Sequence, residues 1–285
     1  MKNVVIIPNY KKDENFIVSS NVANKLCELG FEVFVDERFV SYFGQNTAKS
    51  YAEFPKDADL IAVVGGDGSV IDASKFAIEN DIPIVGVNLG KVGYLSEIEL
   101  DNLSVLDGLI SGEYQIEEKM LLASCTESDG VVSEQLNLAL NDIVISHEGY
   151  LGIAGFRVEN SNGDSVKYRA DAIILSTPTG STAYSLSAGG PIISHSLDAI
   201  LVTPVCPHSF FNRSILFSSN ERLKVTNICN MSLNISVDGR CIAKLKENDA
   251  CTVYIADKKL KTLTFKKGNM FSTLFKKMKI LEDIK

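Results

Sequence analysis

The apolar residues of the first hundred positions follow two spacings in alternation. Continuous apolar runs predict strands at 4–7, 31–35, 60–64 and 84–87. Apolar residues three or four apart predict three helices: one on Val18, Val22, Leu26 and Leu29 that Gly30 ends, one over 70–79, and one on Leu103, Leu106 and Ile110. Unbroken apolar strands separated by helices favour a parallel sheet covered on both faces.

The pattern changes after about residue 112. The dipeptides Asp129-Gly130, Asn162-Gly163 and Asp238-Gly239 are typical of hairpin turns, and segments between them alternate apolar and polar residues. We therefore expect two domains and a tail. Residues 1–112 form an α/β domain with a Rossmann-like parallel sheet, 113–265 form a mostly antiparallel β-rich domain, and 266–285 form a basic tail.

The composition narrows the class of protein. The chain has 285 residues, enough for about two domains, with 45% apolar and 22% charged residues as in ordinary globular proteins. No apolar run reaches the ~18 residues of a membrane helix, so we expect no membrane span. Six scattered cysteines without a C-x-x-C pair, and three isolated histidines, indicate thiols in a reducing cytosol and no metal site built by the protein alone.

Charge is unevenly distributed along the chain. The net charge of −8 argues against a general nucleic-acid-binding surface. Residues 258–285 hold nine lysines against Glu282 and Asp283, so this end carries +7 and the remainder −15. Two interpretations of the basic end stay open. It is a solvated end that packs Phe271, Leu274, Phe275 and Met278 inward, or it attracts phosphates or a partner.

The sharpest local signal is the stretch Gly65-Gly66-Asp67-Gly68-Ser69, between an apolar strand and a helix. Glycines let backbone N–H groups approach a ligand closely, and a helix start favours anions, so this loop suits a phosphate. Asp67 would repel phosphate oxygens, which is tolerable if it binds a hydroxyl, takes a proton or faces a metal ion. The alternative is a tight turn in which Asp67 caps the helix.

Two further stretches place polar residues beside apolar strands. The loop Asn88-Leu89-Gly90-Lys91-Val92-Gly93-Tyr94 follows the fourth strand and should open at the same sheet edge, where the Asn88 amide can both donate and accept. It could also be a plain glycine-rich turn.

Asn141-Asp142 interrupts an apolar stretch, where polar groups are costly to bury without partners. An amide beside a carboxylate suits a ribose diol, or the pair is a turn or bulge.

The run from Thr177 to Pro191 is rich in hydroxyls and glycines and has the chemistry of a helix start. Hydroxyls and free N–H groups bind phosphates and ribose, and the Tyr184 ring can lie on a base. In the alternative interpretation, Thr179 or Ser181 only caps the helix. Arg169 and Asp171, just before the next expected strand, are candidates for the same site.

Together these stretches closely resemble the NAD kinase family. The resemblance rests on 65–69, 88–95, 141–142 and 177–191, and continues through Pro207-His208-Ser209, Asn212-Arg213 and Val237-Asp238-Gly239. It covers about residues 1–265. It implies a cytoplasmic enzyme that uses ATP and a divalent metal (Mg²⁺) to phosphorylate the 2′-hydroxyl of the adenosine ribose of NAD, giving NADP. It also implies a homodimer or homotetramer.

The resemblance assigns roles to individual residues. Asp67 would be the base, with Gly68 beside the substrate, and Asn141 and Asp142 would hold NAD. The other residues expected to bind the nucleotides are Gly66, Ser69, Asn88, Arg169, Asp171, Thr179, Thr182, Ala183, Tyr184, Ser185, Leu186, Ser187, Asp238 and Arg240.

Three residues depart from the family pattern. Asp72 stands where a basic residue is common, Ser214 where a proline often follows the Asn-Arg pair, and Arg240 where glutamine is common. Asp72 puts one phosphate contact in question, and Arg240 is a candidate to supply it. Two other functions stay open. A lipid or sugar kinase of the same superfamily shares the first motif but not the 177–191 run, and a non-catalytic nucleotide sensor would be favoured by loss of Asp67.

Overall fold

The computed structural model describes residues 1–44, 47–90, 93–96, 98–133, 135–149, 152–265 and 274. The chain divides into two compact units, one of residues 1–118 and 260–285 and the other of 119–259. The expected division at 112 and 265 therefore differs from the observed one. The reason is that β6 (Gln115–Ser128) and β18 (Ala250–Thr264) each begin in one unit and end in the other, so no turn signal marks the division.

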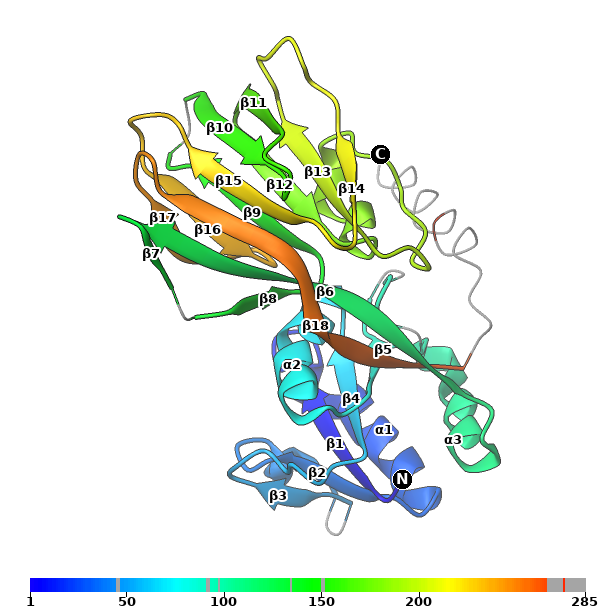
Figure 1. Cartoon of the computed structure of the whole chain (residues 1–285). Coiled ribbons are helices and arrows are strands. Elements are labelled where there is room, and N and C mark those ends of the chain that lie inside the picture. The colour runs from blue at the N-terminus through cyan, green and yellow to red at the C-terminus, as the bar shows by residue number, and fades with distance from the viewer. Residues whose placement is uncertain are drawn as a thin grey trace, which may run out of the picture. The chain divides into compact units, whose positions relative to one another are not determined.

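The first unit is built on a parallel sheet with the strand order β5-β4-β1-β2-β3 (Figure 1). Its strands are β1 (Asn3–Pro8), β2 (Glu32–Asp36), β3 (Lys49–Tyr51), β4 (Leu60–Gly65) and β5 (Ile84–Asn88). Its longer helices are α1 (Ile17–Glu28) and α2 (Asp67–Asn80). All of β4 and β5 is buried, because helices cover a sheet of this kind on both faces. The four predicted strands and the first two predicted helices are confirmed.

The remaining helical turns of the first unit are short. They are η1 (Glu14–Phe16), η2 (Val40–Tyr42), η3 (Leu100–Asp107) and α3 (Gly108–Ser111). The helix expected on Leu103, Leu106 and Ile110 is thus a 3-10 turn followed by one α-helical turn. Asn102 leaves helical geometry at φ −130° and ψ 44°, which breaks the regular spacing. Leu106 joins the core of this unit and Leu103 packs against it, as the apolar spacing predicted, but Ile110 is exposed and Leu109 takes its place in the core.

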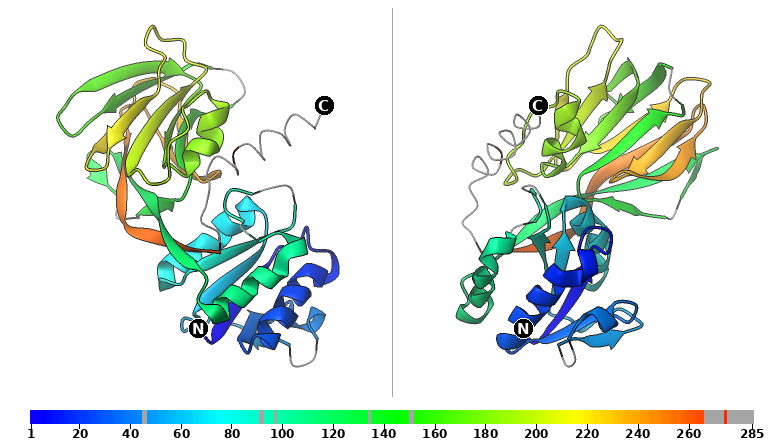
Figure 2. Two further views of the ribbon diagram at one scale, coloured as in Figure 1. Left: turned by 90° about the vertical axis from the view of Figure 1, so that its right-hand side faces the viewer. Right: turned by 180° about the vertical axis from the view of Figure 1, so that it is seen from behind.

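The second unit is made of antiparallel strands in two sheets, which can be followed in Figures 1 and 2. One sheet has the order β14-β13-β12-β9-β16-β17, and the other contains β11, β10, β15 and the first part of β18, with β6 to β8 beside it. Their bounds are β7 (Val131–Val132), β8 (Asn137–Ala139), β9 (Asp142–His147), β10 (Ala154–Glu159), β11 (Ser165–Ala170), β12 (Ala172–Ser176), β13 (Ala199–Val205), β14 (Ile215–Ser218), β15 (Arg222–Asn227), β16 (Leu233–Val237) and β17 (Arg240–Leu245).

Both sheets contribute to one apolar core. Phe156 and Tyr168 from one sheet and Ile145 and Ile173 from the other are fully buried in the same cluster. The expected antiparallel β structure is therefore confirmed. The helical content of this unit is small: η4 (Gly180–Thr182) and α4 (Tyr184–Ser187) lie in the run that follows β12.

Candidate active site

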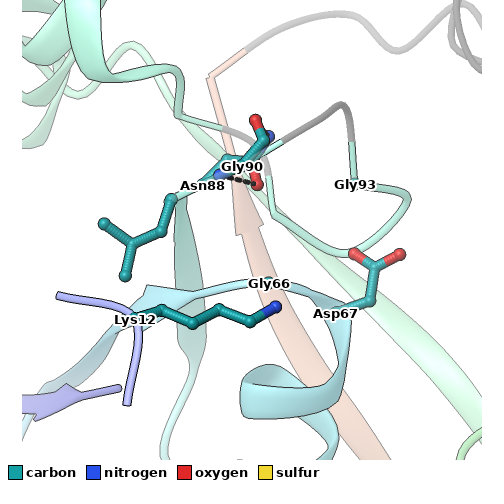
Figure 3. Close-up of a pocket in the computed structure, with 7 residues that line it drawn as sticks. Lys12, Gly66, Asp67, Asn88, Gly90 and Gly93 are labelled. Carbon is teal, nitrogen blue, oxygen red and sulfur yellow. Dashed lines mark hydrogen bonds between the residues drawn. The ribbon is translucent and has the colours of Figure 1, made fainter. Parts of the chain in front are cut away.

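The loops after β4 and β5 meet at one edge of the parallel sheet. Gly65 at the end of β4 pairs with Asn88 at the end of β5, so the residues that follow each strand emerge side by side. They border a pocket of about 350 Å³ (Figure 3). The pocket is lined by Lys12, Gly66, Asp67, Asn88, Leu89, Gly90 and Gly93. The edge location is the one where ligands bind in open α/β sheets.

The Asp67 carboxylate is held in place by the segment that follows β5. One oxygen accepts a hydrogen bond from the Tyr94 N–H and the other accepts one from the Leu95 N–H, both at 3.0 Å. Asp67 is the first residue of α2, but these bonds run to the 93–96 segment and not to the helix. Each carboxylate oxygen thus accepts one backbone N–H, and together the two bonds orient the carboxylate.

Gly93 is required by this arrangement. A Cβ atom on Gly93 would lie 2.5 Å from the Asp67 Oδ1 and 3.1 Å from the Ser96 Cβ. The glycine therefore lets the backbone pass close to the carboxylate. Burial, and secondly the negative charge of Asp67, raise the pKa of the neighbouring Tyr94.

Asn88 and Ser69 shape the loops of this pocket. The Asn88 side chain, 3% exposed, donates from Nδ2 to the Gly90 carbonyl at 3.1 Å and accepts the Gly90 N–H at 3.2 Å. Ser69 Oγ accepts a hydrogen bond from Asn9 Nδ2 at 2.8 Å, which joins the loop after β1 to the start of α2. Of the predicted residues in the first unit, Gly66, Asp67 and Asn88 line the pocket, whereas Ser69 and Gly68 do not.

Lys12 lines the same pocket and was not predicted. It follows β1, which pairs in parallel with β4 through Pro8 and Val64, so its loop opens at the same sheet edge. The topological argument that singled out Asn88 could have found Lys12 as well. A single lysine in a polar stretch carries no motif of its own, and this is why the sequence did not mark it.

In the second unit, Asn141 directly precedes β9 and Asp142 begins it, and Asp238 holds the backbone of both. The Asp238 carboxylate accepts the N–H groups of Leu140, Asn141 and Asp142 at 2.8, 2.8 and 3.1 Å. Asp238 itself is in the left-handed region, at φ 46°, in the turn between β16 and β17. Its expected contact with the nucleotide stays a prediction, but these three bonds give its carboxylate a structural role.

The start of the 177–191 run packs directly on the backbone of Leu140 and Asn141. Thr177 Oγ1 donates to the Leu140 carbonyl at 2.6 Å, and the Thr177 N–H donates to the Asn141 carbonyl at 2.9 Å. A Cβ on Gly180 would lie 1.9 Å from that same Asn141 oxygen, so only glycine fits. The run and the Asn141-Asp142 pair, 36 residues apart in sequence, therefore form one cluster.

The predicted residues of the run divide by exposure. Thr179 and Ser185 are buried, at 6% and 0%, and Ser185 Oγ lies 2.9 Å from Thr203 Oγ1, which is 3.1 Å from Ser214 Oγ. Tyr184 is 46% exposed. Thr182, Ala183 and Leu186 are half-buried and Ser187 is exposed. Thr179 and Ser185 thus pack inside the run and shape it, whereas Tyr184 and Ser187 are exposed and accessible to a ligand.

The other predicted residues of this unit lie on separate strands and turns. Arg169, on β11, is exposed, and its N–H donates to Ser209 Oγ at 2.6 Å. Asp171 lies between β11 and β12, and its carbonyl accepts the His147 N–H at 3.3 Å. Arg240 is exposed at the start of β17. The predicted site residues therefore lie in both units. Within the second unit, Arg169, Asp171 and Arg240 lie on elements apart from the Asn141-Asp142 cluster.

Asp142 is the most perturbed acid of the second group. Its side chain is 6% exposed. Burial, and secondly the charge of Asp238, raise the pKa of Asp142 to about 7. The Asp142 carboxyl therefore changes protonation near neutral pH, and a charged ligand bound beside it would shift that protonation.

In the part of the chain that the structure describes, no three His, Cys, Asp or Glu side chains gather where they could hold a metal ion. None of the helices described there is long and apolar enough to cross a membrane. Leu274, the one described residue of the basic tail, is 7% exposed. Phe271, Phe275 and Met278 lie outside the described residues, so both interpretations of the tail stay predictions.

Comparison with known proteins gives consistent matches over the whole chain. Residues 4–114 match the model of the ATP-NAD kinase N-terminal domain, and residues 140–265 match that of the ATP-NAD kinase C-terminal domain. The NAD kinase of Thermoanaerobacter sp. (strain X514) is 35% identical over 284 residues, covering 98% of this chain and 99% of that protein.

Two solved structures have the same fold. A yeast NADH kinase complexed with NADH superposes with a TM-score of 0.84 at 22% identity, covering 96% of this chain and 86% of that one. An NAD kinase from Archaeoglobus fulgidus in complex with ATP gives a TM-score of 0.72 at 20% identity, covering 97% and 99%. At these identities the likeness concerns the fold alone.

Proposed function

The chain belongs to the NAD kinase family, and from this premise we propose that it transfers the γ-phosphoryl group of ATP to the 2′-hydroxyl of the adenosine ribose of NAD, giving NADP. The observation that carries the proposal is the Asp67 carboxylate. It is oriented by two backbone N–H groups and lines a pocket at the carboxyl edge of the parallel sheet, beside a glycine loop.

Asp67 supplies the base of this reaction. A ribose hydroxyl keeps its proton at pH 7 and is a poor nucleophile. As its oxygen bonds to the γ-phosphorus, the bond from that phosphorus to the ADP oxygen breaks and its electron pair leaves with ADP. The hydroxyl proton passes to Asp67. The Tyr94 and Leu95 N–H groups keep the carboxylate in one orientation throughout.

The acceptor is bound by the second unit. The Asn141 and Asp142 side chains hydrogen-bond NAD, and Tyr184 offers its exposed ring to a base or ribose. Asp238, Thr177 and Gly180 do not need to touch the nucleotide for this, because they hold the backbone from which Asn141 and Asp142 project.

A divalent metal ion fits the first pocket only together with ATP. Among the described residues, Asp67 is the one carboxylate that lines the pocket. Mg²⁺ in such sites is usually held by one or two carboxylates plus the phosphates of the substrate. An Mg²⁺ ion delivered on ATP would therefore be held chiefly by the phosphates, and Asp67 would reach it through a water molecule, so that its carboxylate can still accept the hydroxyl proton. When bound, that ion neutralises charge on the phosphoryl group being transferred.

We further propose that the protein works in the cytosol and forms a homo-oligomer. All six cysteines are free thiols, which agrees with the reducing cytosol proposed from the sequence. A homodimer or homotetramer is proposed on family grounds, and sedimentation at several concentrations would measure it.

Incubation with NAD, ATP and Mg²⁺, followed by a readout enzyme specific for NADP, tests the proposal. NADP should form, and the matched variant Asp67→Asn should lower kcat by about 10²–10⁴-fold, the usual contribution of a positioned base. Phosphorylation of diacylglycerol or fructose 6-phosphate without NADP formation would contradict the proposal in favour of a related kinase. Tight NAD binding without turnover would instead indicate a nucleotide sensor.

A further inference from the structure

We propose that Lys12 binds the triphosphate of the donor nucleotide and is the cation that allows a phosphate chain to enter a pocket that already holds Asp67. The proposal rests on the proposed function, since it assigns a residue to the ATP side of that reaction. It is carried by the position of Lys12 in the Asp67 pocket, by the rigid loop that presents it and by the local balance of charge.

The loop that carries Lys12 is tied through Asn9 to the two elements that flank the Asp67 loop, β4 and α2. The Asn9 N–H donates to the Val64 carbonyl at 2.8 Å, and Asn9 Nδ2 donates to Ser69 Oγ at 2.8 Å. The Asn9 carbonyl then accepts the Lys12 N–H at 3.0 Å. Lys12 is therefore presented from a tight turn anchored on β4 and α2, and its backbone position is fixed relative to Asp67.

The Lys12 side chain reaches into the pocket. Figure 3 shows it extending past Gly66 with its ammonium directed toward the side where Asp67 lies. Across the residues described by the structure, this ammonium forms no ion pair with a carboxylate. The adjacent acid, Asp13, is 3% exposed and faces the other way, accepting the N–H groups of Val18 and Ser19 at the start of α1.

The charges around the pocket explain why a cation is needed there. Of the residues that line it, Asp67 carries the negative charge and Lys12 the positive charge, while the others are uncharged. A triphosphate carries more negative charge than one Mg²⁺ ion neutralises, so it would still be repelled by Asp67 unless a second cation lies nearby. An ammonium on a flexible stem suits this task, because it contacts phosphate oxygens as a point charge.

The test replaces Lys12 by glutamine, which keeps most of the length and removes the charge. Lys11→Gln is the matched control. Lys11 is adjacent and also exposed, but it lies near the Tyr10 ring (5.8 Å from Nζ to the ring centroid) and does not line the pocket. Calorimetry without NAD would measure the affinity of each variant for ATP and for inorganic tripolyphosphate. NAD affinity and the melting temperature would be measured on the same samples.

Lys12→Gln should weaken ATP and tripolyphosphate binding by about tenfold to a hundredfold, the usual range for one charge-assisted hydrogen bond. Lys11→Gln should change both by less than about twofold, NAD affinity should stay unchanged, and Lys12→Arg should restore most of the lost affinity. Equal ATP and tripolyphosphate affinities in Lys12→Gln and wild type would overturn the inference, as would an equal loss of NAD affinity.

These results separate the inference from the proposed function. If the wild type makes no NADP but binds tripolyphosphate through Lys12, the proposed function is wrong and the phosphate site stands. If the wild type makes NADP and Lys12→Gln binds ATP normally, the proposed function stands and the role of Lys12 is wrong.

Discussion

Asp67 in the first unit and Asp238 in the second are both held by backbone N–H groups, but they differ in where the carboxylate lies. Asp67 accepts the N–H groups of Tyr94 and Leu95 and lines a pocket. Asp238 accepts three, from consecutive residues of the Asn141-Asp142 turn. In the first unit the backbone positions a carboxylate for a ligand, whereas in the second a carboxylate positions the backbone. An aspartate in a family motif is therefore not reactive for that reason alone, because it can instead hold the backbone, as Asp238 does.

The largest effect is expected from Gly180→Ala, which tests the scaffold of the second unit. The added Cβ would lie 1.9 Å from the Asn141 backbone oxygen, so the cluster must open. We expect a loss of at least ~3 kcal/mol in the free energy of unfolding, the upper end for overpacking. Denaturant titration measures it. Gly155→Ala in the same unit is the control, because its Cβ would meet a movable Ile228 side-chain carbon at 3.1 Å. Equal losses in both variants would contradict the required fit at Gly180.

Gly93→Ala tests the opposite arrangement in the first unit. Its Cβ would lie 2.5 Å from Asp67 Oδ1, the end of a side chain that can rotate away. A displaced base should lower kcat by about 10²-fold, the cost of a misplacement of about 1 Å. The melting temperature and NAD affinity should change little. A fully active Gly93→Ala enzyme would mean that the observed orientation of Asp67 is not the reactive one.

The elements of the first unit were predictable where apolar residues are continuous. The strands at 4–7, 31–35, 60–64 and 84–87 are observed as β1, β2, β4 and β5. β3 was missed because Lys49 and Ser50 are exposed at the edge of the sheet and carry no apolar signal. The unit boundary was misplaced because β6 and β18 continue through it.

The candidate site was predictable as a set of residues but not as a set of roles. The glycine loop at 65–69 pointed to Asp67, yet nothing in the sequence says that the Tyr94 and Leu95 N–H groups orient it. The role of Asp238 depends on partners 96 to 98 residues away, a separation at which single-sequence patterns carry no information.

The pH dependence of stability sharpens the account of Asp238. The pKa of Asp142 is about 7 in the folded protein, against about 4 for an unfolded aspartate. The folded state therefore binds more protons between these values, so the stability that this group contributes is lost as pH rises from about 4 through 7. Asp142→Asn does not titrate. Its stability relative to wild type, measured by chemical unfolding, should rise between pH 5 and pH 8 by about 2–3 kcal/mol, since the two pKa values give nearly two pH units of differential proton binding over this range. A constant difference would mean that Asp142 is not neutralised beside Asp238.

The smallest effect is expected at Tyr184, which is 46% exposed. If the ring lies on a base or ribose, Tyr184→Phe should keep NAD affinity within about twofold, while Tyr184→Ala should lose up to about tenfold. Titration of both variants with NAD measures this. Equal losses would assign the contact to the hydroxyl, and unchanged affinity in both would place Tyr184 outside the nucleotide site.

The central claim is that Asp67 does chemistry while Asp238 holds structure, and a paired measurement of Asp67→Asn and Asp238→Asn tests it. Turnover, NAD affinity and the free energy of unfolding are measured on the same preparations. Asp67→Asn should lose about 10²–10⁴-fold in kcat with NAD affinity nearly unchanged, and ~1–3 kcal/mol of stability, because either the Tyr94 or the Leu95 N–H loses its acceptor. Asp238→Asn should lose ~1–3 kcal/mol of stability together with NAD affinity, because buried N–H groups lose their acceptor. A fully active Asp67→Asn enzyme, or an inactive Asp238→Asn enzyme of full stability and NAD affinity, would contradict the account.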